Sequence, residues 1–358
     1  MPPSFPYGGM ENPTLTFVMP SIISGDKSLI GLTTHQISHS WCGNLVTMKD
    51  WSNFWLNEGF DVFMETKIIE LTKGKEMAKL HALTYKNMLN DVIVSLGESK
   101  SFTSLQPYLL GRHPDDAFSV IPYIKGFLFL YFLEDLVNSK SDIDLFRKIL
   151  RNYYTNFKYQ SINYKDFKDF FENIIKEELP SEAEKILNQI DWIKWIEAPG
   201  MPPKDLNFSN TYDNIVKEMI NLFYENQLPS DFDATFKKWD IEIQTDFIAY
   251  ILEREKELDD GQYNYLINTL NLTRDYNVQI KVLSYEIVLS KRNALEDKIK
   301  EELIEFLGTV GRINYLRELY PLFYKKDANA ALETFEKYKS FYHPMVAKYI
   351  EIALKNIS

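Results

Sequence analysis

The chain has 358 residues, 45% of them hydrophobic and 25% charged, which is typical of a globular protein long enough for about two domains. Its formal net charge of −11 argues against nucleic acid or an anionic membrane surface as a partner. Cys42 is the only cysteine, the N-terminus lacks the features of a signal peptide, and no apolar run approaches the ~18 residues of a membrane span. These features predict a cytoplasmic protein without a transmembrane helix.

The first half of the chain predicts a strand followed by helices. Residues 14–18 are β-branched and apolar, which favours a short strand. Residues 27–41 and 51–71 carry helical patterns and each is followed by a glycine. Pro122 can open a further helix at its first turn, ahead of a long apolar run.

Residues 196–210 contain three prolines and a glycine and form the clearest linker. Beyond the linker, successive segments carry apolar residues at positions i, i+3 and i+4, which is typical of amphipathic helices. Short connections between such helices predict a stack of helical hairpins, a small α-solenoid. The segments are 212–226, 241–257, 262–272, 276–290, 295–307, 312–324, 328–339 and 343–355.

His35 and His39 are spaced for binding one metal ion. On a helix, residues four apart lie about 40° from each other around the axis, so both imidazoles can face the same ion. Glu58, nineteen residues after His39, can supply a third ligand and leave one position for water, as in catalytic zinc sites. The alternative is two half-buried histidines and a surface glutamate, but Glu58 lies in an apolar segment where an unpaired carboxylate would be costly. We therefore expect one zinc ion per chain.

Gln36 occupies the position after the first histidine. In zinc peptidases with the H-E-x-x-H motif, a glutamate at this position is the general base. An amide can accept a hydrogen bond, but it cannot take a proton from water or deliver one to a leaving amine. Loss of such a group costs roughly 10²–10⁴-fold in rate. The sequence therefore predicts an intact metal site with impaired proton transfer.

Three separated motifs together resemble the gluzincin zinc aminopeptidases, and within them the leukotriene A4 hydrolase branch. They are Pro6-Tyr7-Gly8-Gly9-Met10-Glu11-Asn12-Pro13, the H-x-x-x-H helix with Ser40-Trp41, and Trp55-Leu56-Asn57-Glu58-Gly59. The likeness continues through Pro122-Tyr123 and the linker, so it covers essentially the whole chain. It implies a mainly α protein with a thermolysin-like catalytic domain lacking its first strands (1–195), a Pro-rich linker (196–210) and an α-helical, solenoid-like C-terminal domain (211–358).

The resemblance also implies a role for each matching residue. His35, His39 and Glu58 match the zinc ligands, and Tyr123 matches the tyrosine that stabilises the oxyanion. The motif Gly8, Gly9, Met10 and Glu11 matches the exopeptidase motif, in which the backbone holds the peptide and the glutamate binds its free amine. Asp115 matches the acid that places water for epoxide hydrolysis, and Arg312 matches the arginine that binds the substrate carboxylate.

Three departures from the family pattern accompany Gln36. Phe118 stands where the branch carries a second tyrosine, and Asn314 stands where it carries a second basic residue. The family also has a β-rich domain ahead of the Glu11 motif. The resemblance therefore leaves three functions open: an impaired aminopeptidase, an epoxide hydrolase without peptidase activity, and a non-catalytic zinc protein. The expected partners are peptides with a free N-terminus or a lipid epoxide carboxylate, with a separate chain supplying the N-terminal half as a further alternative.

Overall fold

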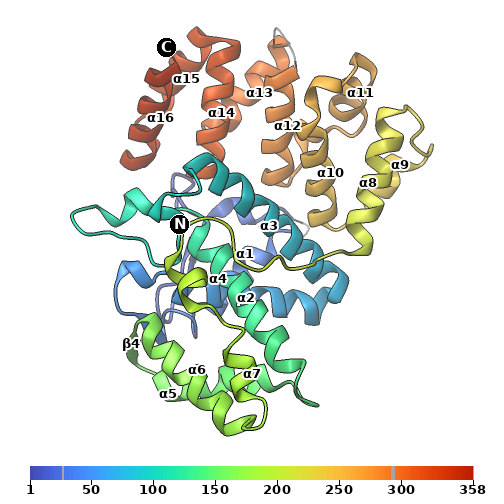
Figure 1. The fold of residues 1–358 in the computed structure, drawn as a ribbon. Coiled ribbons are helices and arrows are strands. Elements are labelled where there is room, and N and C mark those ends of the chain that lie inside the picture. The colour runs from blue at the N-terminus through green and yellow to red at the C-terminus, as the bar shows by residue number, and fades with distance from the viewer. Residues whose placement is uncertain (26–27, 292–294, 358) are drawn as a thin grey trace. The chain divides into compact units, whose positions relative to one another are not determined.

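The computed structural model describes residues 1–25, 28–291 and 295–357, and it is mainly α-helical, as the sequence predicts (Figure 1). The chain divides into two compact units. One comprises Thr34–Asn210, and the other combines Met1–Thr33 with Thr211–Ser358. No helix among the described residues combines the length and apolar character that crossing a membrane requires.

The Thr34–Asn210 unit is built around helix α2 (Trp55–Lys73), which packs along α4 (Ile121–Asn138) and against α3 (Lys75–Leu96). The two central helices are buried over most of their length, because both are apolar around much of their circumference. The remaining elements of this unit lie around them. They are β3 (Val46–Met48) paired in parallel with β4 (Gln160–Ile162), α5 (Leu145–Phe157), α6 (Tyr164–Glu178), α7 (Ala183–Leu187) and a π-helical turn (Ile193–Glu197).

Two glycines allow the central helices to cross closely. A Cβ atom added to Gly59 of α2 would lie 2.7 Å from the Cα atom of Gly126 in α4. Only glycine permits such a close approach of two helix backbones. Glu58 directly precedes the first glycine, and Tyr123 lies three residues before the second. The crossing therefore sets the distance between the helix turns that carry these two side chains.

The other unit contains a row of helices that continues from one hairpin to the next. Figure 1 shows α8, α10, α12, α14 and α16 side by side, and each packs on the next in this order. This arrangement is that of a small α-solenoid. The helices are α8 (Thr211–Tyr224), α9 (Phe232–Phe236), α10 (Ile241–Glu253), α11 (Asp260–Asn264), α12 (Val278–Lys291), α13 (Asp297–Leu307), α14 (Ile313–Lys326), α15 (Ala328–Tyr338) and α16 (Pro344–Ile357).

Two predicted elements of the first half are shorter than expected. The strand expected over 14–18 is reduced to β2 (Phe17–Val18), which pairs with β1 (Gly9–Met10), because Thr14 adopts a turn conformation with φ of 69°. The helix expected over 27–41 is α1 (Ile30–Ser38), and Lys27 lies outside the described residues. The helix expected from Trp51 begins with a 3₁₀ turn over Trp51–Asn53. The Asp50 side chain caps this turn by accepting a hydrogen bond from the main-chain N–H of Ser52.

Several helices are missing from the prediction, and one predicted helix is wrong. The helices that were not predicted are α3, α5, α6, α7 and α9. The single helix predicted over 262–272 is instead a run of short pieces: the end of α11, a π-helical turn at Tyr265–Thr269 and a 3₁₀ turn at Leu272–Arg274. Asn271 separates the last two pieces in the left-handed conformation, which an α-helix cannot include.

Candidate metal centre

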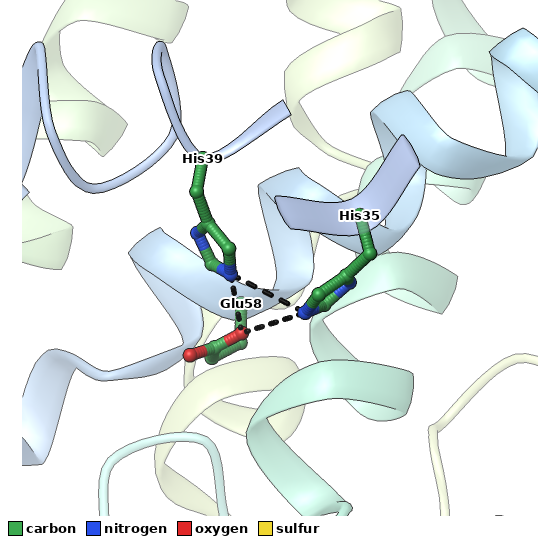
Figure 2. A group of neighbouring side chains, drawn as sticks. All are labelled: His35, His39 and Glu58. Atoms are coloured by element: carbon green, nitrogen blue, oxygen red, sulfur yellow. Dashed lines mark hydrogen bonds and ion pairs between the residues drawn. The ribbon is translucent and has the colours of Figure 1, made fainter. Parts of the chain in front are cut away.

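The three expected metal ligands lie together in the Thr34–Asn210 unit. His35 lies on α1, His39 directly follows its last residue, and Glu58 lies in the first turn of α2. The Nε2 atoms of the two histidines are 3.3 Å apart. The Oε2 atom of Glu58 is 3.3 Å from Nε2 of His39 and 3.8 Å from Nε2 of His35 (Figure 2). Three ligand atoms from separate residues thus form one small triangle.

The size of this triangle fits zinc. Zinc binds nitrogen and oxygen ligands at about 2.0–2.2 Å in tetrahedral geometry, which separates ligand atoms by about 3.3–3.6 Å. The three distances between the Nε2 atoms and Oε2, 3.3, 3.3 and 3.8 Å, lie close to this range. Two imidazoles and one carboxylate are also the donor set of several catalytic zinc sites. The residues present therefore fit a zinc ion with one position left for another ligand.

The other ring nitrogens of both histidines have partners of their own. The Nδ1 atom of His39 lies 2.8 Å from the main-chain oxygen of Cys42. The Nδ1 atom of His35 lies 2.6 Å from Oδ2 of Asp61. Each Nδ1 thus faces an acceptor oxygen, and each Nε2 faces the other proposed ligands. This is the ring orientation that a histidine ligand requires.

Three carboxylates from one face of α2 surround the two imidazoles. Glu58, Asp61 and Glu65 recur at intervals of three and four residues, and all three are buried. Burial lowers the pKa of His39, but the Glu58 and Asp61 carboxylates outweigh this effect and raise it to about 9. Burial raises the pKa of Asp61 to about 6, although the neighbouring His35 opposes that rise. The cluster therefore favours a positive charge between the rings, which either a proton or a metal cation can supply.

Gln36 is buried on α1 next to His35. Its Oε1 atom has no hydrogen-bond partner within the described parts of the chain. A buried carbonyl oxygen without a donor costs roughly 1–3 kcal/mol, so this atom is suited to a water molecule or another external donor. The side chain thus offers an acceptor but no basic group.

Tyr123 lies beside the first ligand. Its ring stacks on the ring of His35 with a centroid distance of 6.2 Å and an interplanar angle of 18°. Phe54 and Phe118 contact the ring of Tyr123 edge-on, at centroid distances of 5.8 and 6.2 Å. Three aromatic contacts fix the orientation of the ring at the start of α4.

Asp115 lies further from the ligands, at the edge of an apolar pocket. It is exposed, and its carboxylate lies 3.5 Å from the ring of His113. Phe118 contributes an apolar ring to the wall of this pocket. Besides Asp115 and Phe118, the pocket is lined by Trp51, Phe54, Phe102, Ser104, Leu105, Pro107, Leu109, Pro114, Ala117 and Pro122.

The remaining expected site residues belong to the other unit. Gly9 and Met10 form β1, and Gly8 and Glu11 flank it. A Cβ atom added to Gly8 would lie 3.5 Å from Nη2 of Arg312, so this backbone passes close to the guanidinium group. The Arg312 side chain is held by the hydroxyl of Tyr315, which lies 2.9 Å from Nη1. The unit therefore brings Gly8, the first residue of this motif, close to Arg312.

Two groups beside the histidines were not predicted from the sequence. The Cys42 carbonyl carries no sequence signal, because any residue at that position offers the same atom. Asp61 does carry one, since it lies three residues after Glu58 and therefore on the same face of α2. A search for acids at helical spacing from a candidate ligand would have found it.

Comparisons with known proteins agree with the fold. Residues 1–195 match the model of the peptidase family M1 domain, and residues 239–354 match that of the leukotriene A4 hydrolase C-terminal domain. The chain is 36% identical to leucine aminopeptidase 2 of Aspergillus terreus and 37% identical to that of Aspergillus clavatus. Each alignment covers 98% of this chain and 56% of the relative. The chain thus spans a little over half the length of these relatives.

Solved structures show the same likeness. The structure of yeast LTA4 hydrolase in complex with bestatin superposes with a TM-score of 0.88 at 30% identity, over 99% of this chain and 58% of the other. Native leukotriene A4 hydrolase from Saccharomyces cerevisiae gives a TM-score of 0.84 with the same identity and coverage. The M1 match covers more than half of the chain, and the C-terminal match specifies the branch. This chain belongs to peptidase family M1, in its leukotriene A4 hydrolase branch.

Proposed function

We propose that this chain forms the zinc-binding part of an aminopeptidase whose peptide hydrolysis is limited by Gln36. The observation that carries the proposal is the triangle of His35 Nε2, His39 Nε2 and Glu58 Oε2, with edges of 3.3 to 3.8 Å. The proposed domains are residues 1–195 and 211–358, joined by the linker 196–210, and the proposed location is the cytoplasm.

The zinc ion would be held by His35, His39 and Glu58. When bound, zinc acts as a Lewis acid and lowers the pKa of water at its open position to about 7. The hydroxyl of Tyr123 would donate a hydrogen bond to the peptide carbonyl oxygen as negative charge develops on it. The stacking of this ring on His35 supports that placement.

The substrate would be a peptide with a free N-terminus. The carboxylate of Glu11 would pair with the terminal ammonium group, a charge-assisted bond that an internal peptide unit cannot make. The backbone of Gly8 and Gly9 would hold the peptide beside it. This arrangement would explain removal of one residue at a time.

Gln36 would limit the rate because it provides no base. Its buried Oε1 can accept a hydrogen bond from water, and so it can position the nucleophile. The same atom cannot remove the proton from that water or pass it to the leaving amine. A loss of roughly 10²–10⁴-fold is expected for an absent general base.

The test is a comparison of the zinc-loaded chain with its Gln36→Glu variant on leucine p-nitroanilide. The variant should be faster by roughly 10²–10⁴-fold. A Gln36→Glu, Glu58→Ala double variant is the matched control and should show no gain, since it lacks a zinc ligand. Both assays are repeated after adding, as a separate chain, the part of Aspergillus terreus leucine aminopeptidase 2 that does not align with this chain. The proposal is contradicted if Gln36→Glu is no faster than the parent both with and without the added segment.

Epoxide hydrolysis is the second candidate, favoured by the apolar pocket with Asp115 at its edge. Opening an allylic epoxide needs mainly a Lewis acid at the epoxide oxygen, so Gln36 should affect it less than peptide cleavage. Asp115 would place the attacking water, and Arg312 would bind the lipid carboxylate. Assays of both reactions on one preparation, with and without Gln36→Glu, test this. An equal change in both rates would contradict a selective loss of the peptidase.

A further inference from the structure

We propose that Asp61 is a positioning residue that orients His35, one of the two histidine ligands of the proposed zinc site. The inference rests on the proposed zinc site and adds a residue to it. The two oxygens of the Asp61 carboxylate face different rings. Oδ2 lies 2.6 Å from Nδ1 of His35, and Oδ1 lies 3.7 Å from Nδ1 of His39. Nδ1 of His39 has the main-chain oxygen of Cys42 at 2.8 Å as its closer partner, so Asp61 contacts His35 directly and lies beside His39.

Glu65 is the other carboxylate behind the ligands, and its contact is weaker. Its Oε2 atom lies 3.4 Å from Nδ1 of His35, which is 0.8 Å longer than the contact made by Asp61. Its Oε1 atom lies 3.9 Å from the ring of His81, so part of this carboxylate faces away from the ligands. Asp61 is therefore the principal partner of His35.

A second metal ion does not explain the contact between Asp61 and His35. Ligand atoms on one zinc ion are separated by about 3.3 Å or more. The 2.6 Å between Nδ1 and Oδ2 is instead a direct contact of an imidazole with a carboxylate. The Asp61 carboxylate therefore lies against the ring nitrogen of His35 that does not face the other proposed ligands.

The position of Asp61 on its helix explains why it lies against His35 and beside His39. It lies one turn after the ligand Glu58, on the same face of α2, and its side chain is fully buried. Packing on all sides leaves the carboxylate little freedom to leave the rings. The carboxylate is also costly to bury unless the imidazoles remain beside it. Asp61 and the two histidines therefore hold one another in place.

A carboxylate behind a histidine ligand raises the basicity of the ring and fixes its direction. Removal of such a partner typically lowers metal affinity 10–100-fold. Asp61→Asn keeps the size of the side chain but removes its charge, so we expect zinc to bind 10–100-fold more weakly. Glu65→Gln should have a smaller effect, because its contact is longer.

The experiment measures the zinc dissociation constant of the full chain by competition with a chromogenic chelator. The matched control is Glu70→Gln, which removes a carboxylate from the same helix where it pairs with Lys67 at 3.2 Å instead of facing the histidines. The visible spectrum of the cobalt-substituted protein is recorded as well, since it reports ligand geometry. If Asp61→Asn does not fold, Asp61→Ser takes its place, because serine is small and keeps an acceptor.

A 10–100-fold loss of affinity in the Asp61 variant, with an altered cobalt spectrum and an unchanged Glu70→Gln control, supports the positioning role. Zinc affinity and cobalt spectrum equal to those of the parent would overturn it, even if the variant melts at a lower temperature. A parent chain that binds no zinc would overturn the proposed function, and the role of Asp61 with it.

Discussion

Gly59 and Gly126 meet where α2 crosses α4, and a Cβ atom on the first would lie 2.7 Å from the Cα atom of the second. The crossing lies next to the proposed ligand Glu58 and one turn after Tyr123. The proposed metal site and the group proposed to stabilise the oxyanion are therefore held by the same close contact of two helices.

Gly59→Ala should destabilise the protein. The new methyl group meets backbone atoms that cannot rotate away, so the helices must move apart. Overpacking of this kind costs about 1–3 kcal/mol and occasionally more. The free energy of unfolding in urea measures the loss, and Ser95→Ala at an exposed position of α3 is the control. A variant as stable as the parent would show that the helices can separate without cost.

Lys125 should contribute to stability through the linker. Its ammonium group is fully buried and donates to the main-chain oxygens of Thr103 (3.1 Å), Ala198 (2.9 Å) and Gly200 (2.9 Å). Lys125→Met leaves these acceptors without their donor and should cost roughly 2–4 kcal/mol. Thermal unfolding compared with Lys140→Met, an exposed lysine, measures the effect. Equal melting temperatures for the two variants would contradict it.

The same lysine should make stability depend on pH. Burial lowers the pKa of Lys125 to about 8, below the ordinary value of 10.5. Between these values the unfolded chain binds more protons than the folded one, so the contribution of this group to stability rises as the pH increases from about 8 to 10.5. Unfolding measured across this range should show a slope that Lys125→Met lacks. An identical pH profile for parent and variant would refute the assignment.

Tyr123→Phe should lower the peptidase rate without removing zinc. The phenyl ring can keep the stacking on His35, but the hydrogen-bond donor is lost. Removal of one such donor costs about 10²–10³-fold in kcat. The measurement is made in the Gln36→Glu background, where activity is highest, with Tyr159→Phe at an exposed position as the control. A variant that keeps the full rate would exclude Tyr123 from the reaction.

Local periodicity explains which parts of the structure could be predicted. The spacing of His35 and His39 depends on helix geometry alone, so their convergence was predictable from the sequence. The amphipathic helices of the C-terminal half follow from the same periodicity. Asn271 shows where prediction from periodicity fails. This one residue adopts a left-handed conformation and interrupts the helix, although the apolar pattern continues through the segment.

Contacts between distant segments carry no comparable sequence pattern. The approach of Gly59 to Gly126 depends on how two helices cross, and neither glycine indicates its partner. The hydrogen bonds of Lys125 to three separate carbonyl groups are hidden for the same reason. Asp61 is intermediate, since helical spacing relates it to Glu58 but only the fold places it behind both histidines.

The most direct test of the zinc site is the metal content of the purified parent, Gln36→Ala and Glu58→Ala chains after dialysis, measured by mass spectrometry. In the proposed site Glu58 supplies a ligand atom and Gln36 does not. The parent and Gln36→Ala should therefore each keep about one zinc ion per chain, whereas Glu58→Ala should lose it. Zinc retained by Glu58→Ala at the level of the parent would contradict the site formed by His35, His39 and Glu58.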